Sequence, residues 1–263
     1  WGAAAELAAG RGTLVAKNRA WLPAHRQQLS IVRPKEGYAS VVLVAIGGAE
    51  PGTKAGVNEK GLVIVSATAS QVPAADRNRA DRKKGLINRL LARCAGVDEV
   101  LARIHEFDRP VFYLIGDRKE IAVIEVAPDG NRSISRTNSG VLHHTNHYEA
   151  IDPPGLARRP SVSSKTRSER IADLLKTADG PYTAEDFIRF MQKPVLAGSA
   201  IHLGTLAARS ENGSREMNRT IVFEPVGTGE DAVSASESLK LAIYPLIKGE
   251  YATSTGDVFS IGR

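Results

Sequence analysis

The densest group of functional side chains in the sequence is the segment HHTNH at residues 143–147. Three histidines this close together suggest a metal site, because imidazole is a common metal ligand. No carboxylate or cysteine lies close in sequence to complete a ligand set, and on a strand His143 and His147 would share one face while His144 points away. We therefore expect no bound metal and favour hydrogen-bonded histidines where a strand runs into a turn.

Asn146, in the same segment, is a candidate for a different chemistry. A side-chain amide at the end of a strand can donate a hydrogen bond to the oxyanion that develops during acyl transfer. Asparagine is also a common turn residue, and taken alone this one is more typical of a turn. The segment by itself leaves both interpretations open.

The overall composition is that of an ordinary globular protein. The chain has 263 residues, of which 42% are hydrophobic and 24% charged, enough to bury a substantial core. Its single cysteine, Cys94, excludes an intrachain disulfide and, inside a helical pattern, is best interpreted as a packed apolar side chain. No apolar run approaches the roughly 18–20 residues of a membrane span, so we expect no membrane partner.

The positive charge is the feature that would favour a nucleic-acid partner. The formal net charge is +6, and basic residues gather in the segments 76–94 and 156–170. Aromatic residues make up only 5% of the chain and neither segment contains one, so no base-stacking surface is predicted. We expect solvated basic faces and no nucleic acid, with a nucleic-acid-associated protein kept as an alternative.

The pattern along the chain alternates between groups of strands and pairs of helices. Helical periodicity marks four segments, which form two consecutive pairs, and β-branched runs bounded by turn residues mark the rest. This order predicts an α+β fold in which each helix pair covers one face of two stacked, mostly antiparallel sheets, a four-layer αββα sandwich in a single domain of residues 1–263. The predicted strands are 12–18, 39–48, 61–68, 110–117, 120–130, 139–146, 219–225 and 238–245, and the predicted helices are 84–94, 97–107, 164–176 and 181–192.

Five segments in this order resemble a known family. The resemblance is to the N-terminal-nucleophile (Ntn) amide hydrolases, above all to acyl-coenzyme A:isopenicillin N acyltransferase-like proteins and the related choloylglycine hydrolases, which include bile salt hydrolase and penicillin V acylase. It extends from residue 1 to about residue 225. The segments are TLVAKNRAWLP (13–23), the strand at 39–48, AGVNEKGLVIVSAT (55–68), VLHHTNH (141–147) and SSKTRSERIADLL (163–175).

The resemblance implies an αββα Ntn-hydrolase sandwich that hydrolyses or transfers the acyl group of a small N-acyl amide or other acyl donor, without a cofactor. In such enzymes the mature chain begins with a cysteine whose thiol attacks the carbonyl, while its own α-amine acts as the base. An aspartate after the first strand holds that amine, an arginine braces the pair, and an asparagine with a backbone N–H forms the oxyanion hole. Relatives of this kind also lead us to expect a homodimer or homotetramer.

Several positions of this sequence match the family pattern. Asn146 matches the oxyanion asparagine and Arg167 the bracing arginine. Lys17 stands where bile salt hydrolases have an arginine. The segment that ends at Thr68 stands where relatives present a substrate-facing side chain, and Trp21 is a second expected substrate contact.

Two other positions depart from the pattern. Trp1 stands nearest to the nucleophile and Ala20 stands at the anchoring aspartate, and neither side chain can do that chemistry. The chain thus begins about where a mature enzyme of the family would begin, which fits removal of a signal peptide and a periplasmic or secreted location, although methionine excision leaves the same trace. We expect the chain as written to be catalytically impaired.

Three alternatives remain open from the sequence. Trp1 could be a strand residue a few places after the nucleophile, although Ala20 would still be a loss. The α-amine of Trp1 could act as base for a water nucleophile. The chain could instead be a non-catalytic binding protein in which Lys17 and Arg167, left without the carboxylate, turn toward solvent or hold an anionic ligand.

Overall fold

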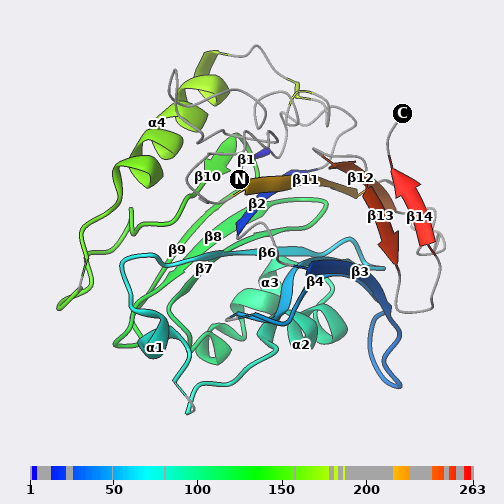
Figure 1. The fold of residues 1–263 in the computed structure, drawn as a ribbon, viewed down its shortest axis with the longest axis horizontal. Helices are drawn as coiled ribbons and strands as arrows, with labels where there is room; N and C mark the ends of the chain where they lie inside the picture. The colour runs from blue at the N-terminus through cyan, green and yellow to red at the C-terminus, as the bar shows by residue number, and fades with distance from the viewer. Residues whose placement is uncertain are drawn as a thin grey trace.

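Two antiparallel sheets stack at the centre of the molecule, with helices outside them (Figure 1). The structure is a computed structural model. It describes residues 2–4, 13–21, 26–48, 50–79, 81–156, 158–177, 181–182, 186, 216–225, 239–245, 249–252 and 258–261.

The larger sheet has seven strands that follow one another in sequence and space. Each neighbouring pair is antiparallel, so short turns are enough to connect most of them. The strands are β3 (Arg26–Val32), β4 (Ser40–Ile46), β5 (Gly52–Asn58), β6 (Val63–Thr68), β7 (Val111–Gly116), β8 (Ile121–Val126) and β9 (Arg132–Thr137).

The smaller sheet brings together distant parts of the chain, in the order β10-β1-β2-β11-β12. Gly2 on β1 lies opposite His143 on β10, and Ala20 on β2 lies opposite Met217 on β11. The first described strand therefore sits beside the HHTNH segment. The strands are β1 (Gly2–Ala4), β2 (Leu14–Trp21), β10 (Val141–His143), β11 (Glu216–Pro225) and β12 (Leu239–Pro245), and a separate hairpin contains β13 (Gly249–Ala252) and β14 (Val258–Ile261).

Helices flank the two sheets on opposite sides (Figure 1). The first group lies beside the larger sheet, and the long α4 lies beyond the smaller sheet, near β10. This arrangement confirms the predicted αββα order. The helices are α1 (Ala74–Arg77), α2 (Leu86–Arg93), α3 (Val97–Leu101), the 3-10 turn η1 (Ile104–Glu106) and α4 (Val162–Thr177).

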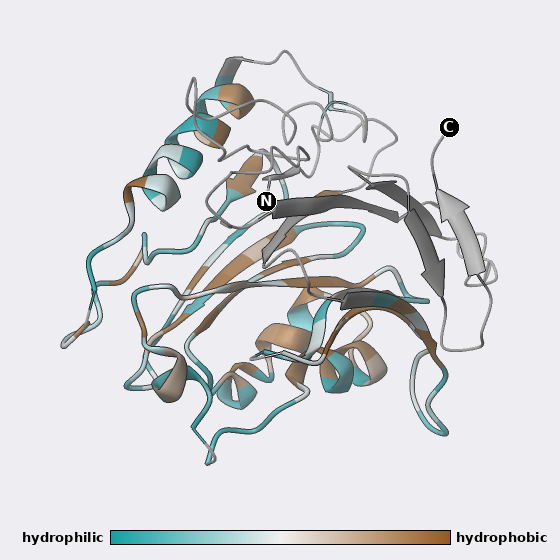
Figure 2. Ribbon diagram, in the orientation of Figure 1, coloured by the Kyte–Doolittle hydropathy of each residue, from teal (hydrophilic) through white to brown (hydrophobic). Residues whose placement is uncertain are grey.

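Strand β4 is apolar on both faces, as expected for a strand buried between two layers. Val42 packs with Leu90 and Leu91 under α2, whereas the next residue, Leu43, packs with Val15 of β2 between the sheets. Successive side chains of a strand point to opposite faces, so each face meets a different apolar layer. Strands of the larger sheet and the helices beneath it accordingly carry many apolar residues (Figure 2).

The turn between β5 and β6 fixes α2 to the sheet. The side-chain amide of buried Asn58 donates to the carbonyls of Leu91 and Cys94, each at 2.7 Å, which satisfies acceptors at the end of the helix. Close packing is possible because Gly56 has no side chain: a Cβ there would lie 2.7 Å from Leu91 Cδ1. The segment between the two strands is therefore also a helix anchor.

Three sequence predictions differ from the structure. The helix predicted over 97–107 ends at Leu101 and resumes only as η1, because the chain turns to bury Phe107 against Tyr113. The strand predicted over 139–146 ends at His143, so the histidines do not alternate along one strand. Six strands were not predicted, namely β1, β3, β5, β9, β13 and β14. Of these, β9 is a largely exposed run of polar residues with little apolar alternation.

Most of the helix predicted over 181–192 lies outside the described residues. Among the helices that the structure describes, none combines the length and the apolar character needed to cross a membrane.

Candidate active site

The side-chain amide of Asn146 is held on both sides by groups from two other elements. Arg167 Nη2, on α4, donates to Asn146 Oδ1 at 3.0 Å, and Asn146 Nδ2 donates to the carbonyl of Thr68, on β6, at 2.9 Å. A guanidinium can only donate and a carbonyl can only accept, so these partners fix which end of the amide is oxygen. The second Nδ2 hydrogen has no partner among the described residues and is available to an acceptor.

The backbone of Asn146 is equally constrained. Its N–H donates to Ser164 Oγ at 3.0 Å, and its carbonyl accepts from both the N–H and the hydroxyl of Ser70, each at 3.0 Å. Ser164 lies at the start of α4 and Ser70 lies just after β6. The residue is thus clamped between α4 and the larger sheet, as an oxyanion donor must be if it is to act without reorganisation.

Lys17 connects the smaller sheet to the same strand, β6. It lies on β2 with 5% of its surface exposed, and its ammonium donates to the carbonyl of Ser66, two residues before Thr68. It is therefore buried and does not turn toward solvent. Residues Ser66 to Thr68 lie beyond the last β5–β6 register pair, Ala55 with Val65, although the Ser66 hydroxyl still donates to the carbonyl of Lys54 on β5 at 3.2 Å.

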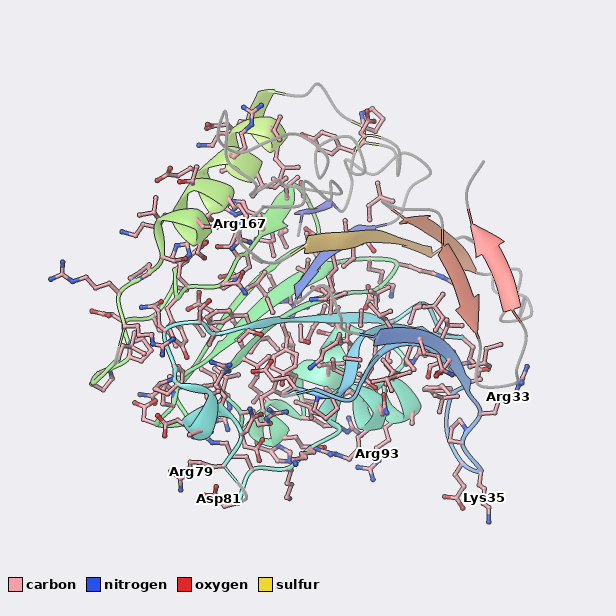
Figure 3. The ribbon with its side chains drawn as sticks, viewed as in Figure 1. Arg33, Lys35, Arg79, Asp81, Arg93 and Arg167 are labelled. Carbon is pink, nitrogen blue, oxygen red and sulfur yellow. The ribbon has the colours of Figure 1, made fainter. Side chains whose placement is uncertain are left out.

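Arg167 points from α4 toward the sheets, whereas Arg79 and Arg93 lie at the outer margin of the molecule (Figure 3). Besides Asn146, it contacts the carbonyl of Ser163 through Nε at 3.1 Å. Four predicted site residues, Lys17, Thr68, Asn146 and Arg167, thus meet along one line across the sheets. The most distant of these residues, Lys17 and Arg167, are 150 positions apart in the sequence.

A buried carboxylate organises the loop after Asn146. Glu125, on β8, contacts His144 Nε2 at 2.8 Å and accepts the backbone N–H groups of Glu149, Ala150 and Ile151 at 2.7 to 3.2 Å. Burial alone would raise the pKa of the Glu125 carboxyl, but the hydrogen bonds from His144 and the backbone outweigh it and the pKa lies below the ordinary value. The ionised carboxylate is therefore part of the native loop.

The other two histidines belong to the same network. His147 Nδ1 lies 2.9 Å from Ser164 Oγ and 3.1 Å from Thr145 Oγ1, while His143 Nδ1 lies 3.4 Å from Ser168 Oγ. Burial lowers the pKa of both imidazoles below the ordinary value, although the nearby Glu149 carboxylate opposes the shift. These contacts fit the interpretation of the segment as hydrogen-bonded histidines at the end of a strand.

These pKa shifts predict two acid steps in thermal stability. Because the pKa values of His143 and His147 are lower in the folded than in the unfolded state, the unfolded state takes up protons first as the pH falls below about 6.5, and stability is lost there. The lowered pKa of Glu125 adds a further loss below about pH 4.5. Melting temperatures measured across this range should show both steps, and His147→Gln should weaken the first. A melting temperature that stays flat down to about pH 5 would contradict this account.

Ser164 is predicted to be the main anchor of the loop on α4. Ser164→Ala leaves the N–H of Asn146 and the imidazole of His147 without their buried partner, which should cost about 1–3 kcal/mol of unfolding free energy. Ser163→Ala, one residue earlier, is the control and should stay within about 0.5 kcal/mol. Urea denaturation of the two variants measures the difference, and equal losses would show that the hydrogen bonds of Ser164 are not the cause.

Of the three remaining predicted site residues, the structure gives strand positions for two. Ala20 and Trp21 lie on β2, with Ala20 opposite Met217 and Trp21 opposite Glu216. Trp1 lies outside the described residues, next in sequence to Gly2 on β1. The roles assigned to these three positions stay predictions.

Sequence reasoning missed Glu125, Ser70 and Ser164. Glu125 carried a usable signal, because it is the one charged residue in the otherwise apolar strand IAVIEV and a buried charge needs partners. The two serines carried none, since isolated serines near strand and helix ends are common. Within the part of the chain that the structure describes, no three His, Cys, Asp or Glu side chains converge so as to hold a metal ion.

The sequence is similar to a known protein family. The model of the family described as acyl-coenzyme A:6-aminopenicillanic acid acyl-transferase matches residues 7–200. No curated protein matches the sequence.

Solved structures show the same fold at low sequence identity. A mutant of the conjugated bile acid hydrolase from Clostridium perfringens is similar with a TM-score of 0.56 and 13% identity, covering 100% of this chain and 96% of that chain. The Caenorhabditis elegans ortholog of N-acylethanolamine-hydrolyzing acid amidase is similar with a TM-score of 0.57 and 10% identity, covering 93% and 98%. Both likenesses establish the architecture of the two sheets and their helices.

Proposed function

Because the chain belongs to the acyl-coenzyme A:6-aminopenicillanic acid acyl-transferase family, we propose that it binds small N-acyl amides or acyl donors between its sheets. We further propose that the chain as written is impaired in cleaving them. The reaction of this site type is attack on the acyl carbonyl, followed by transfer of the acyl group to water or to an amine.

The observation that carries the proposal is the clamped amide of Asn146. Arg167 and the Thr68 carbonyl fix its orientation and leave one N–H for an incoming oxygen. A preorganised donor of this kind is worth about 10²–10³ in rate, because it stabilises charge that develops only during the reaction.

The proposed impairment rests on the nucleophile and its anchor. Trp1 has no nucleophilic side-chain atom, and Ala20 cannot accept a hydrogen bond from an α-amine. Loss of the nucleophile in a comparable covalent hydrolase costs on the order of 10⁶ in rate, about 8 kcal/mol. Substrate binding depends on other groups and is expected to survive.

The second candidate function is a binding protein for an acylated, anionic ligand, favoured by two cations at the site. Lys17 is a buried ammonium on β2, and Arg167 lies beside Asn146. In this case the ligand carboxylate, not the acyl carbonyl, would be the main recognition group.

Ligand binding and turnover together test the proposal. The panel is a conjugated bile acid, an N-acylethanolamine and a penicillin, with release of the acyl or amine product followed by chromatography. The chain as written should release no product but should melt at a higher temperature with at least one ligand, since a ligand that binds only the folded state stabilises it. Arg167→Gln should reduce that shift, whereas Arg170→Gln, on the same helix, should not.

The outcomes separate the candidates. A shift that requires a ligand carboxylate and is absent with the uncharged N-acylethanolamine favours the binding protein. No shift with any ligand would count against binding between the sheets, and turnover by the chain as written would contradict the proposed impairment.

A further inference from the structure

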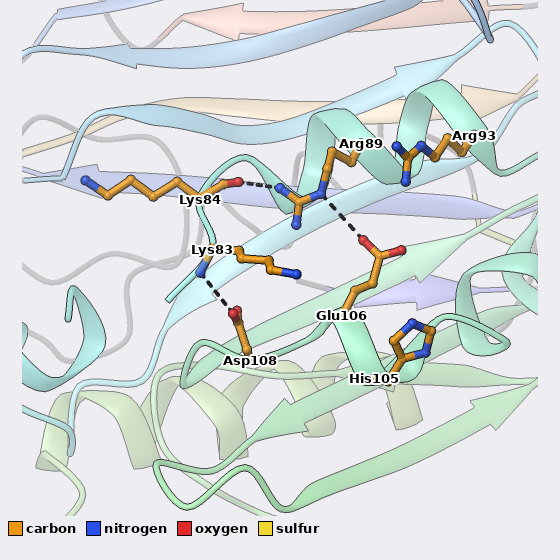
Figure 4. A pocket seen from close by; sticks show the side chains of 7 residues that line it. All are labelled: Lys83, Lys84, Arg89, Arg93, His105, Glu106 and Asp108. Atoms are coloured by element: carbon orange, nitrogen blue, oxygen red, sulfur yellow. Dashed lines mark hydrogen bonds and ion pairs between the residues drawn. The ribbon is translucent and has the colours of Figure 1, made fainter. Parts of the chain in front are cut away.

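A cavity lies on the outer, helical side of the seven-stranded sheet. It has a volume of about 640 Å³, within the range of small-molecule sites. Residues before α2, on α2, and on and just after η1 line it (Figure 4). The lining residues are Lys83, Lys84, Arg89, Arg93, His105, Glu106 and Asp108.

The lining is unusually rich in cations. The lining includes four basic residues and two carboxylates, a formal net charge of +2 with His105 neutral, although the Lys84 side chain extends away from the other groups in Figure 4. Arg89 and Arg93 are four residues apart on α2, so they lie on the same side of the helix and repel each other. Two like charges at this spacing slightly destabilise a helix. An anion bound between the two arginines would relieve their repulsion.

Arg89, which lines the cavity, has one buried donor without a partner among the described residues. Its Nη1 donates to the Lys84 carbonyl and its Nε lies 3.5 Å from Glu106 Oε2, but Nη2 is shielded from solvent and has no hydrogen-bond partner among the described residues. A buried charged donor left unsatisfied is costly. Because the Arg89 side chain is itself 30% exposed, a small turn of its guanidinium into the cavity would let an oxygen atom of a bound anion satisfy this donor.

The two carboxylates are already partly engaged by the protein. Glu106 faces Arg89, and Asp108 accepts the backbone N–H of Lys83 at 2.9 Å (Figure 4). They would repel a simple anion but can accept hydrogen bonds from hydroxyl groups of a ligand. The lining therefore fits a molecule with an anionic head, for the arginines, and a hydroxylated body, for the carboxylates.

We propose that this cavity binds a small phosphate monoester that also carries hydroxyl groups. Arginine is suited to the phosphate, because its planar fork of donors matches two phosphate oxygens. Arg89 supplies the buried contact, Arg93 a contact at the rim, and Lys83, whose ammonium lies among the acidic and basic groups in Figure 4, neutralises further charge. The site does not depend on the proposed amide chemistry between the sheets.

Isothermal titration calorimetry with ribose 5-phosphate tests the proposal on the full chain at about 0.15 M salt. Binding with a dissociation constant below about 1 mM is expected, with inorganic phosphate competing and ribose not binding. Arg89→Met should weaken binding at least about 10-fold, and Arg93→Gln, on the exposed rim, about 3-fold to 10-fold. Arg79→Gln is the control; this exposed arginine pairs with Asp81 outside the cavity and should change binding by less than about 2-fold.

Because Arg93 is exposed, its variant should fold even if the Arg89 variant does not. No heat with ribose 5-phosphate would overturn the proposal. So would equal weakening by Arg79→Gln, which would mean that only overall charge matters. Tighter, salt-sensitive binding of a DNA duplex that also depends on Arg79 would assign the basic face to nucleic acid and overturn it as well.

Discussion

Replacing Trp1 by cysteine and Ala20 by aspartate together is expected to raise turnover of a matching N-acyl amide at least about 10³-fold over the chain as written. The cysteine supplies a thiol and the aspartate an acceptor for the α-amine that serves as its base. The clamped Asn146 is already in place to stabilise the oxyanion. The variant must be produced with a free amine at residue 1, because a blocked amine cannot act as a base.

The single substitutions separate the two contributions. Trp1→Cys alone should fall about 10²–10⁴ below the double variant, since residues that act as a unit are not additive. Ala20→Asp alone should stay near the rate of the chain as written, because it restores no nucleophile. Equal rates for all four proteins would show that these positions are not where the nucleophile and its anchor belong.

Removing the Glu125 carboxylate is expected to have the largest effect on stability. Glu125→Ala leaves His144 and three backbone N–H groups without their acceptor in a site where Glu125 is 1% exposed. Breaking a buried charged network of this kind costs about 3–5 kcal/mol of unfolding free energy. The loop that carries Asn146 would loosen with it.

Two further variants define the cause. Glu125→Gln keeps the size and one acceptor oxygen, so it should lose less, about 1–3 kcal/mol. Glu169→Ala removes an exposed carboxylate on α4 and should stay within about 0.5 kcal/mol. Urea denaturation gives all three values, and a loss at Glu125 no larger than that at Glu169 would contradict the role of the carboxylate.

The layer order could be predicted from the sequence because its signals are strong and local. The strand around Val42 and Leu43 is apolar on both faces, and α2 presents its leucines with helical spacing. The exposed strand β9 could not be predicted, because it has almost no apolar residues. The break between α3 and η1 could not be predicted either, because it follows from the burial of Phe107, which the local helical pattern does not reveal.

The candidate site was predictable only where a residue type stands out in a recognisable segment. Asn146, Arg167 and Lys17 could be named in this way, and the structure brings them together around β6. Of their supports, Glu125 stands out as the one charged residue of an apolar strand, but its contacts could not be named. Like the contacts of Ser70 and Ser164, they form only through pairing of distant strands and docking of α4. Contacts of this kind depend on tertiary geometry and have no local signature.

The most direct test of the proposed chemistry is whether an acyl group becomes attached at residue 1. The Trp1→Cys, Ala20→Asp variant would be mixed with each N-acyl substrate and analysed by intact-protein and peptide mass spectrometry. We predict an adduct with the mass of the acyl group on the cysteine introduced at position 1, and slower formation of that adduct when Asn146→Ala is added. An adduct at another position, such as Cys94, or turnover that does not depend on position 1, would contradict the account.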